Sequence, residues 1–396
     1  MNAVGGSVTG RWHGEPAELP MRRWAEELRS RLVAPQVDLA LVFMTPHYFE
    51  HAARILELLR VHARVPLLLG CSSASLICGG EEIEDQSGIV LSLLSLPGAV
   101  LKPARFTPEE VGETARTEAW TAATGVKPGS FSGWLTFADP FHADIEGWLK
   151  GWNSAFPGMP MFGGLASGDF QAQETQLYLN GDVFTDGGVA LAVGGAVELK
   201  GVISQGCTPI GETWTLTHVE RNFIRQIGNR PAYQVLLDTY NGLSTREQGL
   251  ARGNLFVGLV VNEYLEEFHR GDFLVRNLLG ADPQSGIVAV GAIPRAGQTM
   301  QFQRRDAEAA HEDLATLLDH FKSTHPHRRI LGACVCSCNG RGERLFGKPH
   351  HDAALIQEKL GPLESSGFFC NGEIGPIGDR NFLHGYTAAV ALFVTK

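Results

Sequence analysis

Apolar residues along the chain alternate between the spacing of a buried strand and the spacing of a helix. Residues 37–44 and 66–70 are short apolar runs that predict buried strands, and the second run stops at Gly70. Between them, the apolar residues of segment 46–63 recur at helical spacing along one stripe. A further apolar run at 88–96 predicts a closing strand. The order is therefore strand, polar turn, helix, short strand with a glycine-rich exit, and closing strand.

This order recurs twice more along the chain, which predicts an internal repeat. The copies cover residues 39–96, 135–193 and 331–394. Gly70 precedes Gly88 by 88 − 70 = 18 positions, and Gly367 precedes Gly385 by 385 − 367 = 18, while the second copy has a longer loop. The long apolar closing strands suit central positions in a sheet. The alternative, that any α/β chain shows this order without a repeat, stays open.

The repeated units predict an α/β protein, with α+β as the alternative, made of two related lobes whose mixed sheets are flanked by helices. In the second half, strands are expected at 255–261, 273–279, 286–293 and 300–303, and a helix at 306–321. A division is expected after Gly194 and Gly195, where an extended stretch begins. The predicted parts are a loose N-terminal arm and helix (1–34), an N-terminal domain (35–199) and a C-terminal domain (200–396).

Composition narrows the class of protein. Lys and Arg total 33 against 43 Asp and Glu, so the net charge is −10, which disfavours nucleic acid and anionic lipid as partners. No stretch is apolar enough to span a membrane, and the N-terminus does not resemble a signal peptide. Seven cysteines without a small-scaffold spacing favour a reduced, cytoplasmic location. The 47 glycines indicate many tight turns or close backbone approaches.

Common enzyme motifs are absent or incomplete. Residues 164–168 place Ser167 next to the final glycine, so they do not form a G-x-S-x-G nucleophile elbow. Residues 342–348 match G-x-x-x-x-G-K, but Pro349 stands where a phosphate-binding loop has Ser or Thr. No catalytic residue and no cofactor are predicted.

Three cysteines alternate along the strand predicted at 330–338, so their thiols share one face. Alternate strand positions lie about 6–7 Å apart, too far for three sulfurs to share one tetrahedral ion without distortion. Core packing is therefore the favoured interpretation for Cys334, Cys336 and Cys338. A metal site completed by Cys370 and the pair His350 and His351 is the weaker alternative, and no metal is predicted.

The turns that follow the short strands are the best candidates for a binding site. Ligands of open α/β sheets settle at the carboxyl ends of strands, where glycine permits close approach to the backbone. Arg341 could bind a carboxylate and Glu373 an amine, so together they would suit a zwitterion. In the alternative interpretation, the glycines are there because the tight turns need a positive φ, and the side chains of Arg341 and Glu373 pair with each other. The predicted ligand-binding residues are Gly70, Cys71, Ser72, Ser73, Gly163, Gly164, Asn339, Arg341, Asn371 and Glu373.

These turns carry a resemblance to a known family. The motifs G-C-S-S at 70–73, F-G-G-L-A-S-G-D at 162–169, C-S-C-N-G-R-G at 336–342 and G-F-F-C-N-G-E-I-G-P at 367–376 occur in this order. With S-Q-G-C-T-P-I-G at 204–211, they resemble the FIST family of F-box and intracellular signal transduction proteins over almost the whole chain. The resemblance implies N-terminal and C-terminal FIST regions and a sensory module proposed to bind small ligands such as amino acids. It supplies no catalytic residue.

The expected function is that of a stand-alone sensory protein. It would bind a small polar metabolite, such as an amino acid, where the turns of the two halves converge, and signal through a separate, unidentified protein. One alternative is an enzyme with Cys71, Cys338 or Cys370 as nucleophile and His350 or His384 as base. Another is a scaffold for protein interactions without a small ligand.

Overall fold

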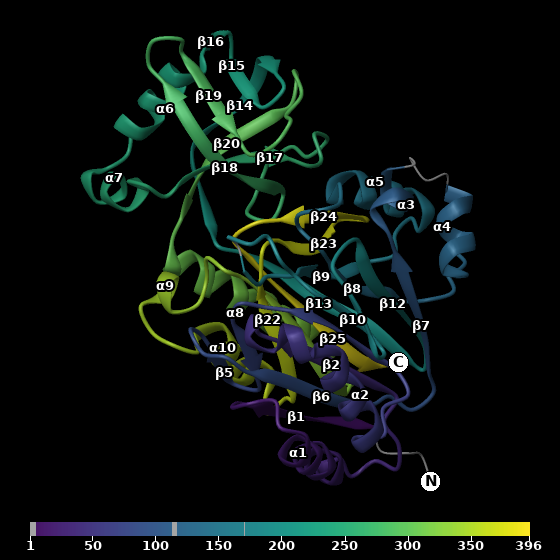
Figure 1. The fold of residues 1–396 in the computed structure, drawn as a ribbon. Coiled ribbons are helices and arrows are strands. Elements are labelled where there is room, and N and C mark those ends of the chain that lie inside the picture. The colour runs from purple at the N-terminus through teal and green to yellow at the C-terminus, as the bar shows by residue number, and fades with distance from the viewer. Residues whose placement is uncertain (1–4, 113–116, 170) are drawn as a thin grey trace. The chain divides into compact units, whose positions relative to one another are not determined.

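A computed structural model describes residues 5–112, 117–169 and 171–396. Helices and strands alternate through most of the chain, which confirms the α/β class (Figure 1). The chain forms two compact units. Unit 1 comprises Met1–Ile203, Leu314–Leu383 and Thr387–Lys396, and unit 2 comprises Ser204–Asp313 and His384–Tyr386. Among the described helices, none combines the length and the apolar character that crossing a bilayer requires.

Unit 1 contains three six-stranded sheets with the same internal order. The first sheet is β1 (Gly6–Trp12), β6 (Ile89–Ser95), β2 (Leu39–Met44), β3 (Leu68–Ser72), β10 (Leu177–Leu179) and β11 (Asp182–Phe184). The second is β7 (Ala99–Phe106), β12 (Gly188–Gly195), β8 (Gly133–Ala138), β9 (Met161–Leu165), β23 (Glu373–Ile377) and β24 (Arg380–His384). The third is β13 (Val197–Gln205), β25 (Thr387–Thr395), β21 (Ile330–Cys338), β22 (Ser365–Cys370), β4 (Leu76–Cys78) and β5 (Glu81–Ile83).

The sheets are linked by a cyclic exchange of hairpins. Each repeat is extended by the strand that precedes it (β1, β7 or β13), and each sheet then takes four strands from one extended repeat and a hairpin from another. The hairpin β10–β11 of the second repeat extends the first sheet, β23–β24 of the third extends the second, and β4–β5 of the first extends the third. The three predicted repeats therefore form one closed arrangement within unit 1.

A steric constraint explains why glycine recurs at the same position in the second strand of each repeat. A Cβ atom at Gly70, Gly163 or Gly367 would lie 1.8, 1.8 or 2.0 Å from the carbonyl oxygen of the residue paired with that glycine in the neighbouring parallel strand. No side chain can be accommodated at such a distance, so only glycine allows the two backbones to approach. The constraint recurs at the same register position in each repeat.

The inward faces of the three sheets share one apolar core. At its centre three phenylalanine rings meet, one from each repeat. The ring centroids of Phe43 and Phe137 lie 5.4 Å apart, those of Phe43 and Phe368 5.0 Å, and those of Phe137 and Phe368 5.5 Å. Cys334 and Cys336 are buried in the same core, as their alternation along the strand predicts.

Helices cover the outer face of each sheet and form a separate apolar cluster there. The first repeat supplies α1 (Glu18–Arg31), the 3-10 helix η1 (Pro46–His51) and α2 (Ala52–His62). The second supplies α3 (Pro108–Gly112), α4 (Thr117–Thr124) and α5 (Ile145–Ala155). The third supplies α8 (Ala307–Thr324), α9 (Glu343–Phe346) and α10 (His351–Leu360).

Unit 2 is inserted into the third repeat, between β13 and α8. Six of its seven strands close on themselves because β14 pairs with both β20 and β15, and β16 is attached to β15. In sheet order they are β14 (Cys207–Glu220), β20 (Thr299–Arg305), β17 (Leu255–Val260), β18 (Phe273–Asp282), β19 (Ile287–Val290), β15 (Phe223–Ile227) and β16 (Arg230–Pro231). Its helices are α6 (Ala232–Asn241) and α7 (Thr245–Ala251).

Two expectations about organisation differ from the structure. The prediction of a loose N-terminal arm was wrong for residues 6–12, which form β1 and pair with β6 along their whole length. Residues 1–4 lie outside the described part of the chain. The repeats also do not divide between two related lobes, because the third repeat lies with the first two in unit 1 and unit 2 is a different, antiparallel structure. The expected division near residue 200 lies close to Ser204, where unit 2 begins.

The glycine constraint predicts the effect of a single methyl group. Gly70→Ala should lower the free energy of unfolding by about 3 kcal/mol or more, the upper end of the usual cost of overpacking. The new Cβ would collide with the backbone carbonyl oxygen of Val42, which cannot move away by changing a side-chain rotamer. The matched control is Gly6→Ala in β1, where a Cβ would contact only the Arg329 guanidinium at 3.7 Å. Urea denaturation of both variants measures the difference. Equal stability of the two variants would contradict the constraint.

Candidate functional site

The predicted turns do converge in unit 1, and we call residues 70–73, 163–167 and 370–373 the turn cluster. The Ser72 hydroxyl donates to the carbonyl oxygen of Ser167 at 2.8 Å. The Ser73 hydroxyl lies 2.9 Å from the carbonyl oxygen of Phe369, which also accepts from the Ser167 hydroxyl. The Asn371 amide donates to the carbonyl oxygen of Ala166 at 3.2 Å. Each turn is thus hydrogen-bonded to another repeat.

Most of the cluster is internal to the protein. Ser72 and Ser73 are fully buried, and Cys71 points into the apolar core. Gly164 permits close packing, since a Cβ there would lie 3.1 Å from the Cys370 sulfur. These groups mainly join the three repeats.

Asn339 and Asn371 lie at the exposed edge of the cluster. Both residues are exposed to solvent, and the side-chain amide of Asn339 donates to that of Asn371 at 2.8 Å. Ligand binding by the ten predicted residues stays a prediction.

Glu373 is buried beside the turn cluster. One carboxylate oxygen accepts from the backbone N–H of Thr387 at 3.0 Å and from its hydroxyl at 2.6 Å, and the other accepts from the Cys370 thiol at 3.1 Å. Burial raises the pKa of Glu373 to about 7, although these hydrogen bonds act to lower it. Burial also raises the pKa of the Cys370 and Cys71 thiols well above the ordinary value, so neither is a ready thiolate.

Arg341 pairs with Asp352 and not with Glu373. Its guanidinium makes two hydrogen bonds to Asp352, from Nε at 2.6 Å and from Nη2 at 3.0 Å, and both side chains are buried. Burial alone would raise the pKa of Asp352, but the Arg341 charge holds it well below the usual range. His351 and Glu82 add contacts to the same carboxylate and its backbone. Such a buried pair is costly to break, because the remaining charge has no partner.

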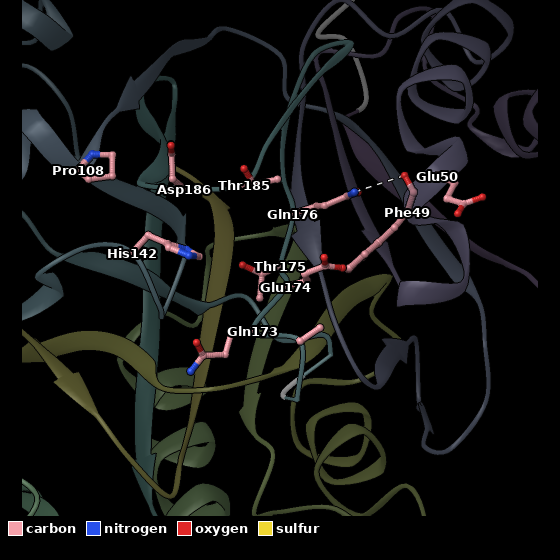
Figure 2. A pocket seen from close by; sticks show the side chains of 11 residues that line it. Phe49, Glu50, Pro108, His142, Gln173, Glu174, Thr175, Gln176, Thr185 and Asp186 are labelled. Atoms are coloured by element: carbon pink, nitrogen blue, oxygen red, sulfur yellow. Dashed lines mark hydrogen bonds between the residues drawn. The ribbon is translucent and has the colours of Figure 1, made fainter.

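A pocket of about 600 Å³ opens in unit 1 beside the turn cluster. In Figure 2, His142, Pro108 and Asp186 lie on one side, Phe49 and Glu50 on the other, and residues 173–176 between them. Phe49 and Glu50 come from η1, and residues 173–176 precede β10. The pocket lies at the place where strands of the first and second repeats share a sheet. Its volume is typical of small-molecule sites.

His142 is held in a fixed orientation on the wall of this pocket. Its Nδ1 lies 2.9 Å from Oδ2 of Asp139, which is fully buried directly after β8. The same carboxylate accepts from the backbone N–H of His142 at 2.6 Å and from the hydroxyl of Thr175 at 2.6 Å. With the proton on Nδ1, the imidazole Nε2 remains an acceptor. The His142 side chain is 55% exposed, so a large part of the imidazole is open to solvent.

Comparison with protein families identifies the chain. The FIST N domain matches residues 38–230, and the FIST C domain matches residues 232–376. The chain belongs to the FIST family. The resemblance found in the sequence is therefore confirmed.

Relatives of this FIST protein occur in bacteria and plants. An uncharacterised protein of Mycobacterium bovis is 36% identical over 374 residues, covering 93% of this chain and 94% of the relative. A second, from Mycobacterium tuberculosis, is 34% identical over 372 residues, again covering 93% and 94%. An F-box/LRR-repeat protein of Arabidopsis thaliana is 32% identical over 126 residues, which are 28% of this chain and 23% of the plant protein.

Among solved structures, the crystal structure of a cyanuric acid hydrolase from A. caulinodans aligns with a TM-score of 0.35 and 9% identity. The alignment covers 99% of this chain and 100% of the hydrolase. A likeness of this level supports no statement about the function of the FIST protein.

Sequence reasoning missed the pocket of this FIST protein because it considered mainly the glycine-rich turns after the second strand of each repeat. Asp139 follows the first strand of the second repeat, and His142 lies three residues later. The rule that ligands settle at carboxyl ends of strands applies there equally. The two polar residues Asp139 and His142, which follow the apolar run 133–138 closely, could have indicated this pocket from the sequence. Among the described residues, no group of three or more His, Cys, Asp or Glu side chains is placed to hold a metal ion.

The buried Glu373 predicts a dependence of stability on pH. Its pKa of about 7 in the folded protein lies above its ordinary value of 4.5, so the folded state binds the proton more tightly than the unfolded state does. The resulting stabilisation is complete below about pH 4.5 and is lost as the pH rises through about 7. Relative to Glu373→Gln, the wild type should therefore lose up to the order of 3 kcal/mol between pH 4.5 and 7. Chemical denaturation across this range measures it. A difference that stays constant with pH would contradict the buried, protonated carboxyl.

Proposed function

We propose that this FIST protein is a sensory protein that binds a small polar metabolite, such as an amino acid, in the pocket beside the turn cluster. The observation that carries the proposal is His142, fixed by buried Asp139 at the wall of a pocket of about 600 Å³. A pocket with a few oriented polar groups is the usual form of a small-molecule site. Family membership supports the sensory role.

Ligand binding would be transmitted through the backbone that joins the pocket to the turn cluster. The backbone N–H of Gln176, in the pocket wall, donates to the Ser72 hydroxyl at 2.9 Å, and the backbone N–H of Ser72 donates back to Gln176 at 2.7 Å. The Gln176 side chain also reaches the carbonyl oxygen of Phe49 across the pocket (Figure 2). A ligand that favours one arrangement of this wall would shift the population of turn conformations. A separate protein would read that change.

The seven free cysteines support a reducing location, for which we propose the cytoplasm. The alternative of a cysteine-dependent enzyme gains no support from Cys71 and Cys370, because burial raises the pKa of both thiols. A scaffold without a small ligand would leave the oriented His142 and its pocket without a role.

A thermal-shift screen with amino acids and other small polar metabolites tests the proposal. A true ligand at 100 times its dissociation constant adds about 2.7 kcal/mol to the free energy of unfolding and raises the melting temperature. His142→Ala should abolish or strongly reduce that shift, since it removes the oriented imidazole. The matched control is His62→Ala, which removes a histidine paired with Glu26 on the helices α1 and α2, away from the pocket.

Two results would contradict the proposed site. In the first, no compound of the panel shifts the melting temperature of the wild type, which favours the scaffold. In the second, a compound shifts it equally in wild type and His142→Ala, which places binding elsewhere.

A further inference from the structure

We infer that the ligand of the pocket is a small organic cation, carrying a primary ammonium or guanidinium group. This inference rests on the proposed function, which places a small polar ligand there without fixing its charge. It follows from the chemistry of the groups that line the pocket.

The charges around the pocket are predominantly negative. Among the described residues that line it, Glu50, Glu174 and Asp186 carry carboxylates, and His142 is the only side chain that can become cationic. The nearby guanidinium of Arg105 is occupied, since it pairs with the Asp186 carboxylate and donates to the carbonyl oxygens of Asp186 and Gly188. Arg105 and Asp186 therefore neutralise each other, and the excess negative charge comes from Glu50 and Glu174. A concave surface with excess negative charge attracts cations and repels anions.

Glu174 is the carboxylate best placed to meet a ligand. Its side chain has no hydrogen bond or ion pair to any described residue, and it belongs to the segment between His142 and Phe49 (Figure 2). Glu50 also has no partner among the described side chains, but in Figure 2 its carboxylate points away from His142. We therefore assign the direct contact to Glu174 and a longer-range electrostatic contribution to Glu50.

Two further groups suit the same ligand. Phe49 presents an aromatic ring, and a ligand cation within about 6 Å of a ring centroid is attracted to its π face. Nε2 of His142 accepts a hydrogen bond when Nδ1 donates to Asp139, so it can receive an N–H of an ammonium or guanidinium group. A carboxylate, an aromatic ring and an imidazole acceptor together favour a donor-rich cation over a carboxylate ligand.

A set of five-carbon probes of equal length separates charge from size. The probes are pentane-1,5-diamine, 5-aminopentanoate, pentanediamide and pentanedioate, with two positive charges, one of each sign, none and two negative charges. Isothermal titration calorimetry at about 50 mM salt should show affinity decreasing in that order, with no binding of the dianion. Raising the salt should weaken binding of the diamine, because the carboxylates are exposed to screening.

Substitution of the carboxylates locates the interaction. Glu174→Gln should weaken diamine binding about three- to fivefold, the effect of losing a partly exposed charge pair, and Glu50→Gln less. The matched control Glu27→Gln, an exposed carboxylate on α1, should leave the affinity unchanged.

The outcomes separate the two proposals. If pentanediamide or pentanedioate binds better than the diamine and His142→Ala removes that binding, the cation inference is wrong while the pocket stands. If the diamine binds with equal affinity to wild type and Glu174→Gln, the assigned contact is wrong. If no probe binds, and the metabolite screen also yields no ligand, both proposals are overturned.

Discussion

The close approach of two backbones at Gly70, Gly163 and Gly367 is the constraint on which the rest of unit 1 depends. At each site the glycine Cα lies against the carbonyl group of the adjacent parallel strand, in a space that no side chain can enter. Because the constraint recurs at one register position, the three sheets end in equivalent ways. The segments after these strands then bond to a different repeat, and the hairpins that follow extend a neighbouring sheet.

This arrangement explains why the buried hydroxyls of the turn cluster are hydrogen-bonded between repeats. The hydroxyl and amide groups of residues that follow a strand at the junction of the three repeats lie next to backbone carbonyl groups. Because a buried polar group without a hydrogen bond destabilises the fold, these groups are expected to bond to those carbonyls. Ser72, Ser73 and Ser167 therefore bond across the junction. The segment that follows β8, the first strand of the second repeat, has exposed polar groups instead. Asp139 uses its carboxylate to orient His142, whose ring reaches solvent in the pocket.

Periodicity and glycine spacing were sufficient to predict the repeated units, because strand burial and backbone approach are local properties. They could not predict the exchange of hairpins, in which Leu76–Cys78 pairs with a strand nearly 300 residues later. The partner of Arg341 could not be predicted for a similar reason: Asp352 lies on a helix whose direction only the folded structure fixes. His142 carried a usable signal, since it follows a predicted strand closely, but a single histidine in a turn is weak on its own.

The most direct test is a crystal structure of the full chain with the compound that gives the largest shift in melting temperature. The account predicts electron density for that compound in the pocket, between the His142 imidazole and Phe49, with a polar group within about 3 Å of Nε2. Density among Asn339, Arg341 and Glu373 would contradict it and would restore the turns as the binding site.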